Sequence, residues 1–227
     1  MQITEIYKSI QGESTHAGLP CVFVRLTGCN LRCSWCDSEY TFTGGHRMAL
    51  DEVLEEVERL SPDGGLVEIT GGEPMLQERE VVPLMQRLLD AGYTVLLETS
   101  GERSLTEVPH GVIKIVDVKC PNSGEPDSFH MENLEALGLQ DEVKFVLSDR
   151  TDYEFAREFV ILHTLDRRVN AVLFSPAFSK EAEGARDCSH CLLDPRELAE
   201  WMLADNLTAR LGLQIHKFIW DPALKGV

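Results

Sequence analysis

The sequence lacks the features by which proteins enter or cross membranes. No stretch of its 227 residues approaches the ~20 consecutive apolar residues that span a bilayer. The N-terminus also lacks the basic and then apolar pattern of a secretory signal. We therefore expect a protein of the cytoplasm that has no membrane partner.

Basic residues are scarce. The 21 Lys and Arg residues stand against 38 Asp and Glu residues, which gives a net charge of −17. Non-specific binding to DNA, RNA or anionic lipid requires clustered positive charge. The composition therefore argues against a nucleic-acid partner, and an anionic substrate would have to be attracted by a few local basic residues.

A disulfide framework is also missing. The seven cysteines are odd in number and three of them fall within eight residues, which is unlike the even, spaced pattern of disulfide-rich secreted domains. A reducing compartment fits this usage. Cys188 and Cys191 form a separate C-x2-C pair that could bind a second metal together with Cys120, or could be loop thiols without a catalytic role.

The feature that is present is a cysteine triplet, Cys29, Cys33 and Cys36, spaced C-x3-C-x2-C directly after the apolar run 22–26. Thiolates select iron–sulfur clusters or zinc. Three thiolates around a 4Fe-4S cluster would leave one of the four irons open to a small chelating ligand. An open coordination position is characteristic of catalytic metal sites.

Two other interpretations of the triplet remain. The cysteines could bind zinc, with His46 or Cys21 as a fourth ligand, because structural zinc sites have four protein ligands. Alternatively, Cys33 and Cys36 could form a C-x2-C redox pair.

Apolar periodicity predicts an alternation of strands and helices. Strands are expected at 2–7, 20–27, 66–70, 93–97, 112–119, 142–147, 170–174 and 208–216, and helices at 48–60, 76–91, 130–137, 152–165 and 195–205. Alternation at roughly 25-residue intervals is typical of parallel βα units. We expect a single α/β domain over residues 1–227, a partial TIM-like (β/α) barrel of about six units, with an open doubly wound sheet as the alternative.

Polar or glycine-rich segments follow the successive predicted strands. They are the cysteine triplet, 70–74 (TGGEP), 98–101 (ETSG), 117–119 (DVK), 175–176 (SP) and 214–217 (QIHK). Because active sites of such folds lie at the carboxyl ends of the strands, we expect these segments to meet in one site. Gly71 and Gly72 could expose backbone groups to the amino or carboxylate group of a ligand, or could simply permit a tight turn.

The combination of the cysteine triplet, the aromatic Trp35 before its last cysteine and the G-G-E-P segment resembles the radical S-adenosylmethionine superfamily. The resemblance implies that three cysteines hold a 4Fe-4S cluster and that the amino acid end of S-adenosylmethionine chelates the fourth iron. An electron from the cluster then generates a 5′-deoxyadenosyl radical that abstracts hydrogen from the substrate, while the protein orients and shields the cofactor.

A narrower resemblance covers essentially the whole chain. The segments YKSIQGES, AGLPCVFVRLTGCNLRCSWCDS, TGGEPMLQ, LETSG and QIHK are similar to those of the 7-carboxy-7-deazaguanine synthase family. This resemblance implies ring contraction of 6-carboxy-5,6,7,8-tetrahydropterin to 7-carboxy-7-deazaguanine with loss of ammonia, as in queuosine biosynthesis. It also implies Mg2+ as a second metal, an electron donor such as a flavodoxin or ferredoxin, and a homodimer.

The resemblance also implies binding roles for individual residues. It implies no catalytic residue, because the cluster and S-adenosylmethionine carry out the chemistry. Cluster ligands are Cys29, Cys33 and Cys36; the magnesium position is Ser38, a hydroxyl oxygen of the type that Mg2+ prefers; S-adenosylmethionine contacts are Trp35, Cys36, Asp37, Gly72, Glu98, Lys119, Ser175, Pro176, Ala177 and Phe178; and substrate contacts are Ile10, Gln11, Gly12, Glu13, Arg25, Thr70 and His216.

Chemistry supports some of these assignments directly. Arg25 can bind a carboxylate with two hydrogen bonds, and Glu13 can accept hydrogen bonds from the guanidine-like edge of a pterin. Arg25 could instead form a buried ion pair, Glu13 could be a solvated loop acid, and His216 could be a strand-end histidine.

Two departures limit the transfer of residues from the family. The segment 117–121 (DVKCP) differs from the S-P-K of relatives, so that only Lys119 matches there, and the chain continues for ten residues beyond Lys217. The competing functions are a glycyl-radical enzyme activase, which shares the short barrel and the cysteine triplet, and a non-enzymatic iron–sulfur or zinc module.

Overall fold

The computed structural model describes residues 1–180, 187–221 and 224–226. Its centre is one nine-stranded sheet with the order β3-β1-β2-β4-β5-β6-β7-β8-β9. The strands are β1 (Gln2–Ile10), β2 (Pro20–Leu26), β3 (His46–Arg47), β4 (Leu66–Gly71), β5 (Thr94–Thr99), β6 (Ile113–Asp117), β7 (Glu142–Leu147), β8 (Ala171–Pro176) and β9 (Arg210–Leu211).

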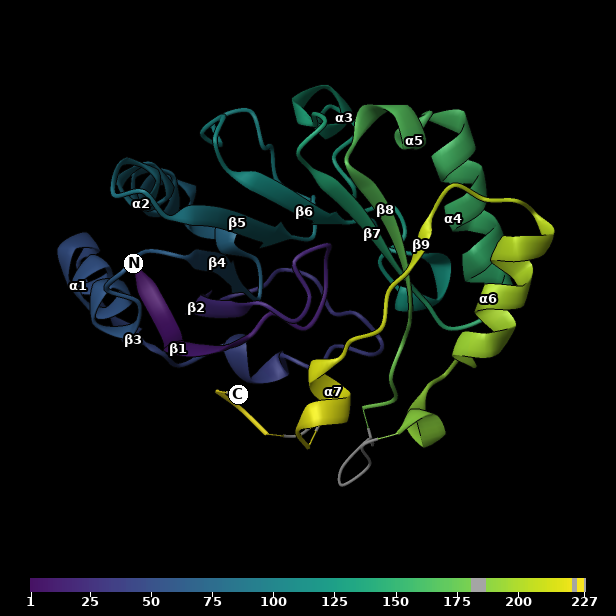
Figure 1. Ribbon diagram of the computed structural model, residues 1–227, viewed down its shortest axis with the longest axis horizontal. Coiled ribbons are helices and arrows are strands. Elements are labelled where there is room, and N and C mark those ends of the chain that lie inside the picture. Colours follow the sequence, from purple (N-terminus) through teal and green to yellow (C-terminus); the bar gives the residue numbers. More distant parts are fainter. Residues whose placement is uncertain (181–186, 222–223, 227) are drawn as a thin grey trace.

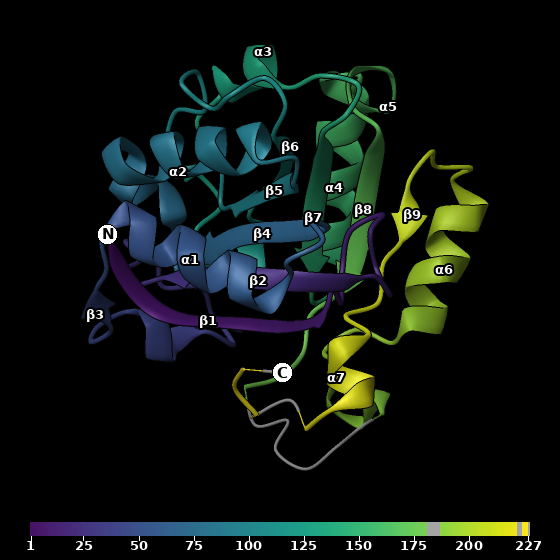
Figure 2. The ribbon, with the colours of Figure 1, turned by 60° about the vertical axis from the view of Figure 1, so that its left-hand side comes forward.

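Helices connect most of these strands. The α-helices are α1 (Leu50–Leu60), α2 (Glu78–Asp90), α3 (Asn133–Ala136), α4 (Arg150–Leu162), α5 (Leu165–Arg168), α6 (Pro195–Ala204) and α7 (His216–Ile219), and the 3-10 helices are η1 (Glu39–Thr41), η2 (Pro74–Gln77), η3 (Pro121–Ser123) and η4 (Cys188–His190). Figures 1 and 2 show α1, α2, α4 and α6 on the outer side of a curved sheet.

The sheet is an open, partial barrel, as predicted. Every neighbouring pair from β2 to β9 is parallel, whereas β1 is antiparallel to both β2 and β3. Within the described ranges no pairing joins β3 to β9, so the two edges of the sheet do not close. In parallel strands the carboxyl ends all meet at one end of the sheet, where α7 and the C-terminal residues also lie (Figure 1).

Alternation along the strands separates two kinds of side chain. On β2, Val22, Val24 and Leu26 are fully buried against the helices, in a cluster shared with α1, α2 and the outward residues of β4 and β5. On the opposite face, Phe23 packs in a separate small cluster inside the curve of the sheet, and Arg25 follows it on the same face toward the strand end. The helices therefore cover an apolar outer face, while the inner face becomes polar toward the carboxyl ends.

Some predicted elements were wrong in extent. The predicted strand 208–216 is a strand only at Arg210–Leu211, and His216 begins the helix α7 instead of ending a strand. The predicted helix 152–165 is two helices, because Thr164 adopts a left-handed backbone conformation with φ of 50°. The edge strand β3 was not predicted, since two exposed residues carry no periodic signal.

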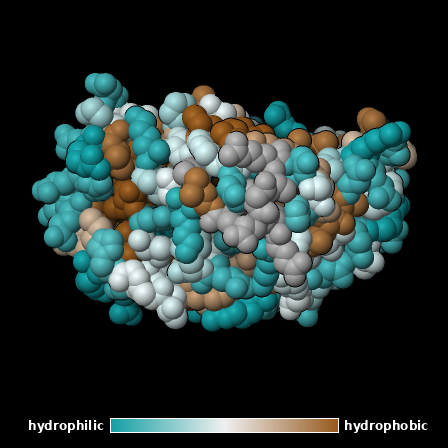
Figure 3. All heavy atoms as spheres, turned by 90° about the horizontal axis from the view of Figure 1, so that it is seen from below, coloured by the Kyte–Doolittle hydropathy of each residue, from teal (hydrophilic) through white to brown (hydrophobic). Residues whose placement is uncertain are grey.

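Among the described residues, no helix is both long enough and apolar enough to cross a bilayer. Figure 3 views the molecule from the side of α7 and the C-terminal residues, where hydrophilic side chains surround smaller apolar areas.

Candidate active site

All of the strand-end segments except 175–176 line one cavity of about 240 Å³ at the carboxyl end of the sheet. Of the predicted site residues, those that line it are Ile10, Gln11, Gly12, Glu13, Arg25, Cys29, Cys33, Trp35, Cys36, Asp37, Ser38, Thr70, Gly72, Glu98, Lys119, Phe178 and His216. Residues separated by more than 200 positions in the sequence thus converge on one space.

Three predicted cofactor residues are not among those that line the cavity. Ser175, Pro176 and Ala177 are buried at the end of β8, where the Ala177 backbone N–H donates to the Leu147 carbonyl. Their neighbour Phe178 does reach the cavity. The assignment of this segment to the cofactor remains a prediction.

Cys29, Cys33 and Cys36 are free thiols, each half-buried on the wall of the cavity. Burial raises the pKa of the Cys29 and Cys33 thiols. Each ligand of a cubane binds a different iron, so the three sulfurs need not converge on one point as the ligands of a single ion do. Among the described residues, three free thiols face this cavity and no fourth cysteine lines it, which fits a 4Fe-4S cluster with one open iron.

The zinc alternatives lack support in the geometry. Cys21 is buried in the apolar cluster inside the sheet, and His46 is exposed on the edge strand β3. Across the described part of the chain, no three His, Cys, Asp or Glu side chains are placed to hold a single metal ion. Cys188 and Cys191 are joined to each other by a disulfide and Cys120 is buried, so this pair is not available as thiolate ligands. The expectation of free loop thiols was wrong for these two residues.

Gly71, the last residue of β4, and Gly72, which follows it, are required by close approach of the backbone. A Cβ atom on Gly72 would lie 2.4 Å from the carbonyl oxygen of Gly28 and 2.6 Å from Cβ of Cys29, and one on Gly71 would lie 2.5 Å from the carbonyl oxygen of Leu26. Neither has a positive φ. Gly71 therefore lets the end of β4 pack against the end of β2, and Gly72 lets the chain after β4 pack directly against the loop that carries the cysteines. The turn interpretation did not include these contacts.

Glu73, in the same TGGEP segment, links two strand ends by hydrogen bonds. Glu73 is fully buried and accepts hydrogen bonds from the side chains of Thr99 and Ser100 and from the backbone N–H groups of Ser100 and Met75. It thereby fixes the ETSG segment after β5 to the segment after β4. A buried carboxylate with four donors has no lone pair left over for a ligand.

Polar contacts of Lys217 join the cysteine loop to the helix α7. Lys217 Nζ lies 2.7 Å from Asp37 Oδ2 and donates to Gln214 Oε1 at 2.8 Å. Loss of hydration around the Asp37 carboxylate would raise its pKa, but the Lys217 ammonium outweighs this effect and lowers it. Asp37, directly after the last cysteine, is thereby held ionised by α7.

The N-terminal segment QGE packs between the sheet and α7. Gln11 donates to Glu68 Oε2 at 2.8 Å, and a Cβ on Gly12 would lie 2.1 Å from Nδ1 of His216. The Ile215 backbone N–H donates to the Gly12 carbonyl. Only glycine fits beside His216, so the QGE segment can pack directly against α7. Burial lowers the pKa of His216, which favours the neutral imidazole near neutral pH.

Arg25 lies on the inner face with a side-chain exposure of 17%. Its Nε lies 3.0 Å from Glu5 Oε1, and its Nη2 donates to the Tyr7 hydroxyl at 2.9 Å. Tyr40 also donates to Glu5. Arg25 therefore does form an ion pair, with Glu5. Its guanidinium also lines the cavity.

The chain beyond Lys217 reaches the cavity. Trp220, Asp221, Leu224, Lys225 and Gly226 contribute to its lining, and Lys225 Nζ lies 4.4 Å from the centre of the Tyr40 ring. The structure brings the described residues of this segment to the side of the cavity formed by η1.

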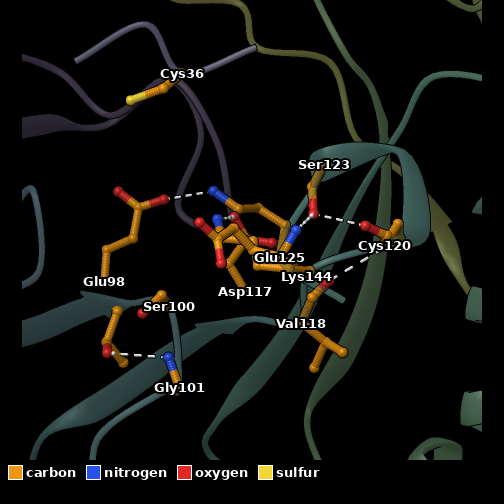
Figure 4. Close-up of polar contacts among 12 residues, drawn as sticks. Cys36, Glu98, Ser100, Gly101, Asp117, Val118, Cys120, Ser123, Glu125 and Lys144 are labelled. Atoms are coloured by element: carbon orange, nitrogen blue, oxygen red, sulfur yellow. Dashed lines mark hydrogen bonds and ion pairs between the residues drawn. The ribbon is translucent and has the colours of Figure 1, made fainter. Parts of the chain in front are cut away.

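Sequence reasoning missed several cavity residues. Besides Tyr7 and Tyr40, they include Glu68 on β4 and Lys144 on β7, whereas Lys217 belongs to the predicted QIHK segment. A signal was available for Glu68 and Lys144, because each is a charged residue inside an otherwise apolar strand, as Arg25 is. Figure 4 shows the Glu98 side chain reaching from β5 toward Lys144, with Cys36 on the loop above them.

Comparison with known proteins gives a consistent picture. The model of the radical SAM superfamily matches residues 23–116, which include the cysteine triplet and the GGEP segment. The chain is 66% identical over 227 residues, 100% of both chains, to the 7-carboxy-7-deazaguanine synthase of Koribacter versatilis. It is 39% identical to the enzyme of that name from Chlorobaculum tepidum, covering 100% of this chain and 97% of the relative.

A solved structure supports the fold. The crystal structure of QueE from Escherichia coli superimposes with a TM-score of 0.71 and 23% identity, covering 93% of this chain and 92% of that one. At this identity the match speaks for the architecture alone.

Proposed function

Because the chain belongs to the 7-carboxy-7-deazaguanine synthase family, we propose that it converts 6-carboxy-5,6,7,8-tetrahydropterin to 7-carboxy-7-deazaguanine with loss of ammonia. It is then a carbon–nitrogen lyase of 7-deazapurine (queuosine-type) biosynthesis. One observation carries this proposal: three free cysteines and a set of charged, hydrogen-bonding side chains face each other across a single cavity.

Cys29, Cys33 and Cys36 would hold the 4Fe-4S cluster, and S-adenosylmethionine would lie against Trp35, Asp37, Gly72, Glu98 and Lys119. When bound, the cluster supplies the electron that releases a 5′-deoxyadenosyl radical from S-adenosylmethionine. The side chains of the cavity orient both ligands and exclude water, which is the protein's share in cofactor chemistry.

The pterin would lie between the QGE segment, Arg25, Thr70 and His216. Burial alone would raise the pKa of Glu13, but the Lys144 ammonium outweighs burial and holds that pKa at about 2, which supports this placement. An ionised carboxylate accepts hydrogen bonds, as the amino-pyrimidine edge of a pterin requires. Arg25 would bind the carboxylate of the substrate through the part of its guanidinium that Glu5 and Tyr7 leave free.

Substitution of Arg25 separates the ion-pair role from substrate binding. Arg25→Lys retains a cation beside Glu5 but loses the planar, two-pronged donor geometry. We expect the KM for the carboxypterin to rise by about 10-fold to 100-fold, the effect of losing one charge-assisted contact, with little change in unfolding free energy. Steady-state kinetics and urea unfolding measure the two quantities, and unchanged KM would leave Arg25 with a structural role only.

Ser38 would bind Mg2+ beside the cluster through its hydroxyl oxygen, a hard ligand of the type that this ion prefers. Its Oγ lies 3.7 Å from Sγ of Cys36 and faces the cavity. We expect Ser38→Ala to weaken magnesium stimulation of product formation and to leave S-adenosylmethionine cleavage largely intact. Product formation is assayed with and without Mg2+, and Ser34→Ala on the same loop is the control. Equal loss of both activities would argue against a metal role for Ser38.

The remaining partners follow the family. We propose a homodimer of the cytoplasm that receives electrons from a flavodoxin or ferredoxin. Purified protein sedimenting as a monomer at micromolar concentration would contradict the dimer.

One anaerobic assay tests the proposed function. Reconstituted protein is mixed with reductant, S-adenosylmethionine and the carboxytetrahydropterin, and products are identified by mass spectrometry. We expect a deazaguanine product with S-adenosylmethionine regenerated. A glycyl-radical activase would consume S-adenosylmethionine without using the pterin, and a cluster-bearing electron carrier or zinc module would be indifferent to both. Absence of the product from protein with an intact cluster would refute the proposal.

A further inference from the structure

Lys144 is a buried cation at the floor of the cavity to which no role has been given. Its side chain is 6% exposed and comes from the middle of β7. The neighbours of Lys144 on β7, Val143 and Phe145, are buried in the apolar core on the opposite face of the sheet. A lysine is almost never buried unless its charge is compensated.

Two acidic side chains compensate this charge from different parts of the chain. Lys144 Nζ lies 2.8 Å from Glu13 Oε2, on the N-terminal segment, and also contacts Glu98 Oε1, at the end of β5. Burial alone would lower the pKa of Lys144, but Glu13, Glu98 and Asp117 outweigh that effect and raise it well above its usual value. The ammonium is therefore a permanent charge between two carboxylates.

The contacts fix the orientation of Glu13. Lys144 occupies its Oε2, and Gln214 donates to its Oε1 at 2.7 Å. An ionised carboxylate offers about four lone-pair sites, so two remain, one on each oxygen. The 2-amino group and the neighbouring ring N–H of a pterin form a matching pair of donors. A carboxylate held at both oxygens can meet that pair without losing side-chain freedom on binding.

From these contacts we propose that Lys144 is a positioning residue that holds the Glu13 carboxylate ready to accept the two-donor edge of the substrate. The inference rests on the proposed function for the identity of the substrate. Lys144 does not itself touch the substrate in this arrangement. It also ties the substrate side of the cavity, through Glu98, to the side assigned to S-adenosylmethionine.

The charged groups around Glu13 determine how its protonation changes when Lys144 is removed. The groups that face it from the packed elements are Lys144 on β7, His216 on α7, Glu98 on β5 and Glu68 on β4. Without Lys144, Glu13 and Glu98 would lose the ammonium that contacts both of them, and both would remain beside the buried Glu68. Glu13 should then take up a proton near neutral pH, and a protonated carboxyl cannot accept both donors.

The test compares Lys144→Met, Lys144→Arg and Lys114→Met. Lys114 is a matched control, because its side chain is also 6% exposed and pairs with Asp141 at 3.0 Å, but it is not among the residues that line the cavity. Carboxytetrahydropterin binding is measured anaerobically by equilibrium dialysis across about pH 5 to pH 9, where carboxyl groups with raised pKa values titrate. No turnover is needed, so binding is read independently of the loaded enzyme.

We expect Lys144→Met to weaken binding at neutral pH by about 100-fold, as loss of one partner of a buried charge pair does, and to recover affinity as the pH rises. Lys144→Arg should restore most of the affinity, whereas Lys114→Met should bind like the wild type. Equal weakening in Lys144→Met and Lys114→Met, or a pH-independent loss in the former, would overturn the proposal.

A second measurement does not depend on the substrate or on a folded Lys144→Met protein. In wild-type protein carrying 13C-labelled glutamate carboxyl groups, the Glu13 resonance is assigned by its absence from Glu13→Gln. It should remain at the ionised position down to about pH 3, below the usual titration range. If Glu13 titrates within the usual range of glutamate, the inference is refuted, even if the enzyme makes the expected product. If Glu13 stays ionised down to about pH 3, the inference is supported, even if the product differs.

Discussion

Replacement of Cys33 by alanine should abolish both the iron–sulfur cluster and the activity. Cys33 is half-buried on the cavity wall and is one of three free thiols that face the same space. Loss of one of three ligands leaves a cubane with two open irons, which the protein cannot retain stably. We expect loss of the broad absorption near roughly 400 nm that thiolate–iron charge transfer produces. Activity should fall by more than about 100-fold, beyond the losses seen when only supporting contacts of a metal site are removed.

Cys120→Ala is the matched control. Cys120 is also a free cysteine but is buried in the core beside β6 and takes no part in the cavity. This variant should retain the full iron content and the absorption near roughly 400 nm, with only the modest destabilisation of a small core truncation. A Cys33→Ala protein that keeps the iron and the absorption would refute the ligand assignment.

The cysteine triplet was predictable because its information is local. Cys29, Cys33 and Cys36 lie within eight residues, so their proximity in space needs no knowledge of the fold. The strand-end segments were predictable for a related reason. Parallel strands bring all their carboxyl ends to one edge, so residues as distant as Thr70 and Lys119 could be assigned to one site once the βα alternation was recognised.

Pairings across the sheet could not be predicted in the same way. Lys144 meets Glu13, which lies 131 positions earlier, because the register of β7 against β6 and the path of the N-terminal segment place them together. A charged residue inside an apolar strand indicates only that the residue faces a polar interior. The sequence does not indicate which residue of opposite charge it will contact.

The C-terminal part of the chain shows why propensity misled. The residues of the predicted strand 208–216 suit a strand, yet only Arg210–Leu211 pairs with β8. The chain then leaves the sheet so that His216 can pack against Gly12 and Lys217 can reach Asp37. Tertiary contacts with the site therefore outweigh local preference. The hydrogen bonds of Glu73 were missed for a similar reason, because three of its four donors belong to Thr99 and Ser100 at the end of the next strand, β5.

The second large effect is expected from a change of one methyl group, Gly72→Ala. The new Cβ would lie 2.4 Å from the Gly28 carbonyl oxygen and 2.6 Å from Cβ of Cys29. The neighbour at 2.4 Å is backbone, which cannot rotate away as a flexible side chain can. The same Gly28 carbonyl accepts a hydrogen bond from the Glu73 N–H at 2.8 Å. The methyl group should therefore push the cysteine loop away from the end of β4 and break this hydrogen bond.

We expect Gly72→Ala to lower the free energy of unfolding by about 1–3 kcal/mol, the usual cost of overpacking. The displaced loop should also carry much less iron after reconstitution and bind S-adenosylmethionine poorly, since ligands must be held close to their productive geometry. Urea unfolding of the iron-free protein measures the first effect, and iron content and equilibrium dialysis measure the others.

Gly138→Ala is the control for the loss of glycine itself. A Cβ on Gly138 would meet only Asp141 Oδ2 at 3.9 Å, an ordinary contact, and its φ is not positive. This variant should unfold like the wild type or be slightly more stable, because alanine restricts the unfolded chain. Wild-type iron content in Gly72→Ala would mean that the loop and the strand can separate without harm to the cluster. In that case the close contact of β4 with the cysteine loop would not be what positions the ligands.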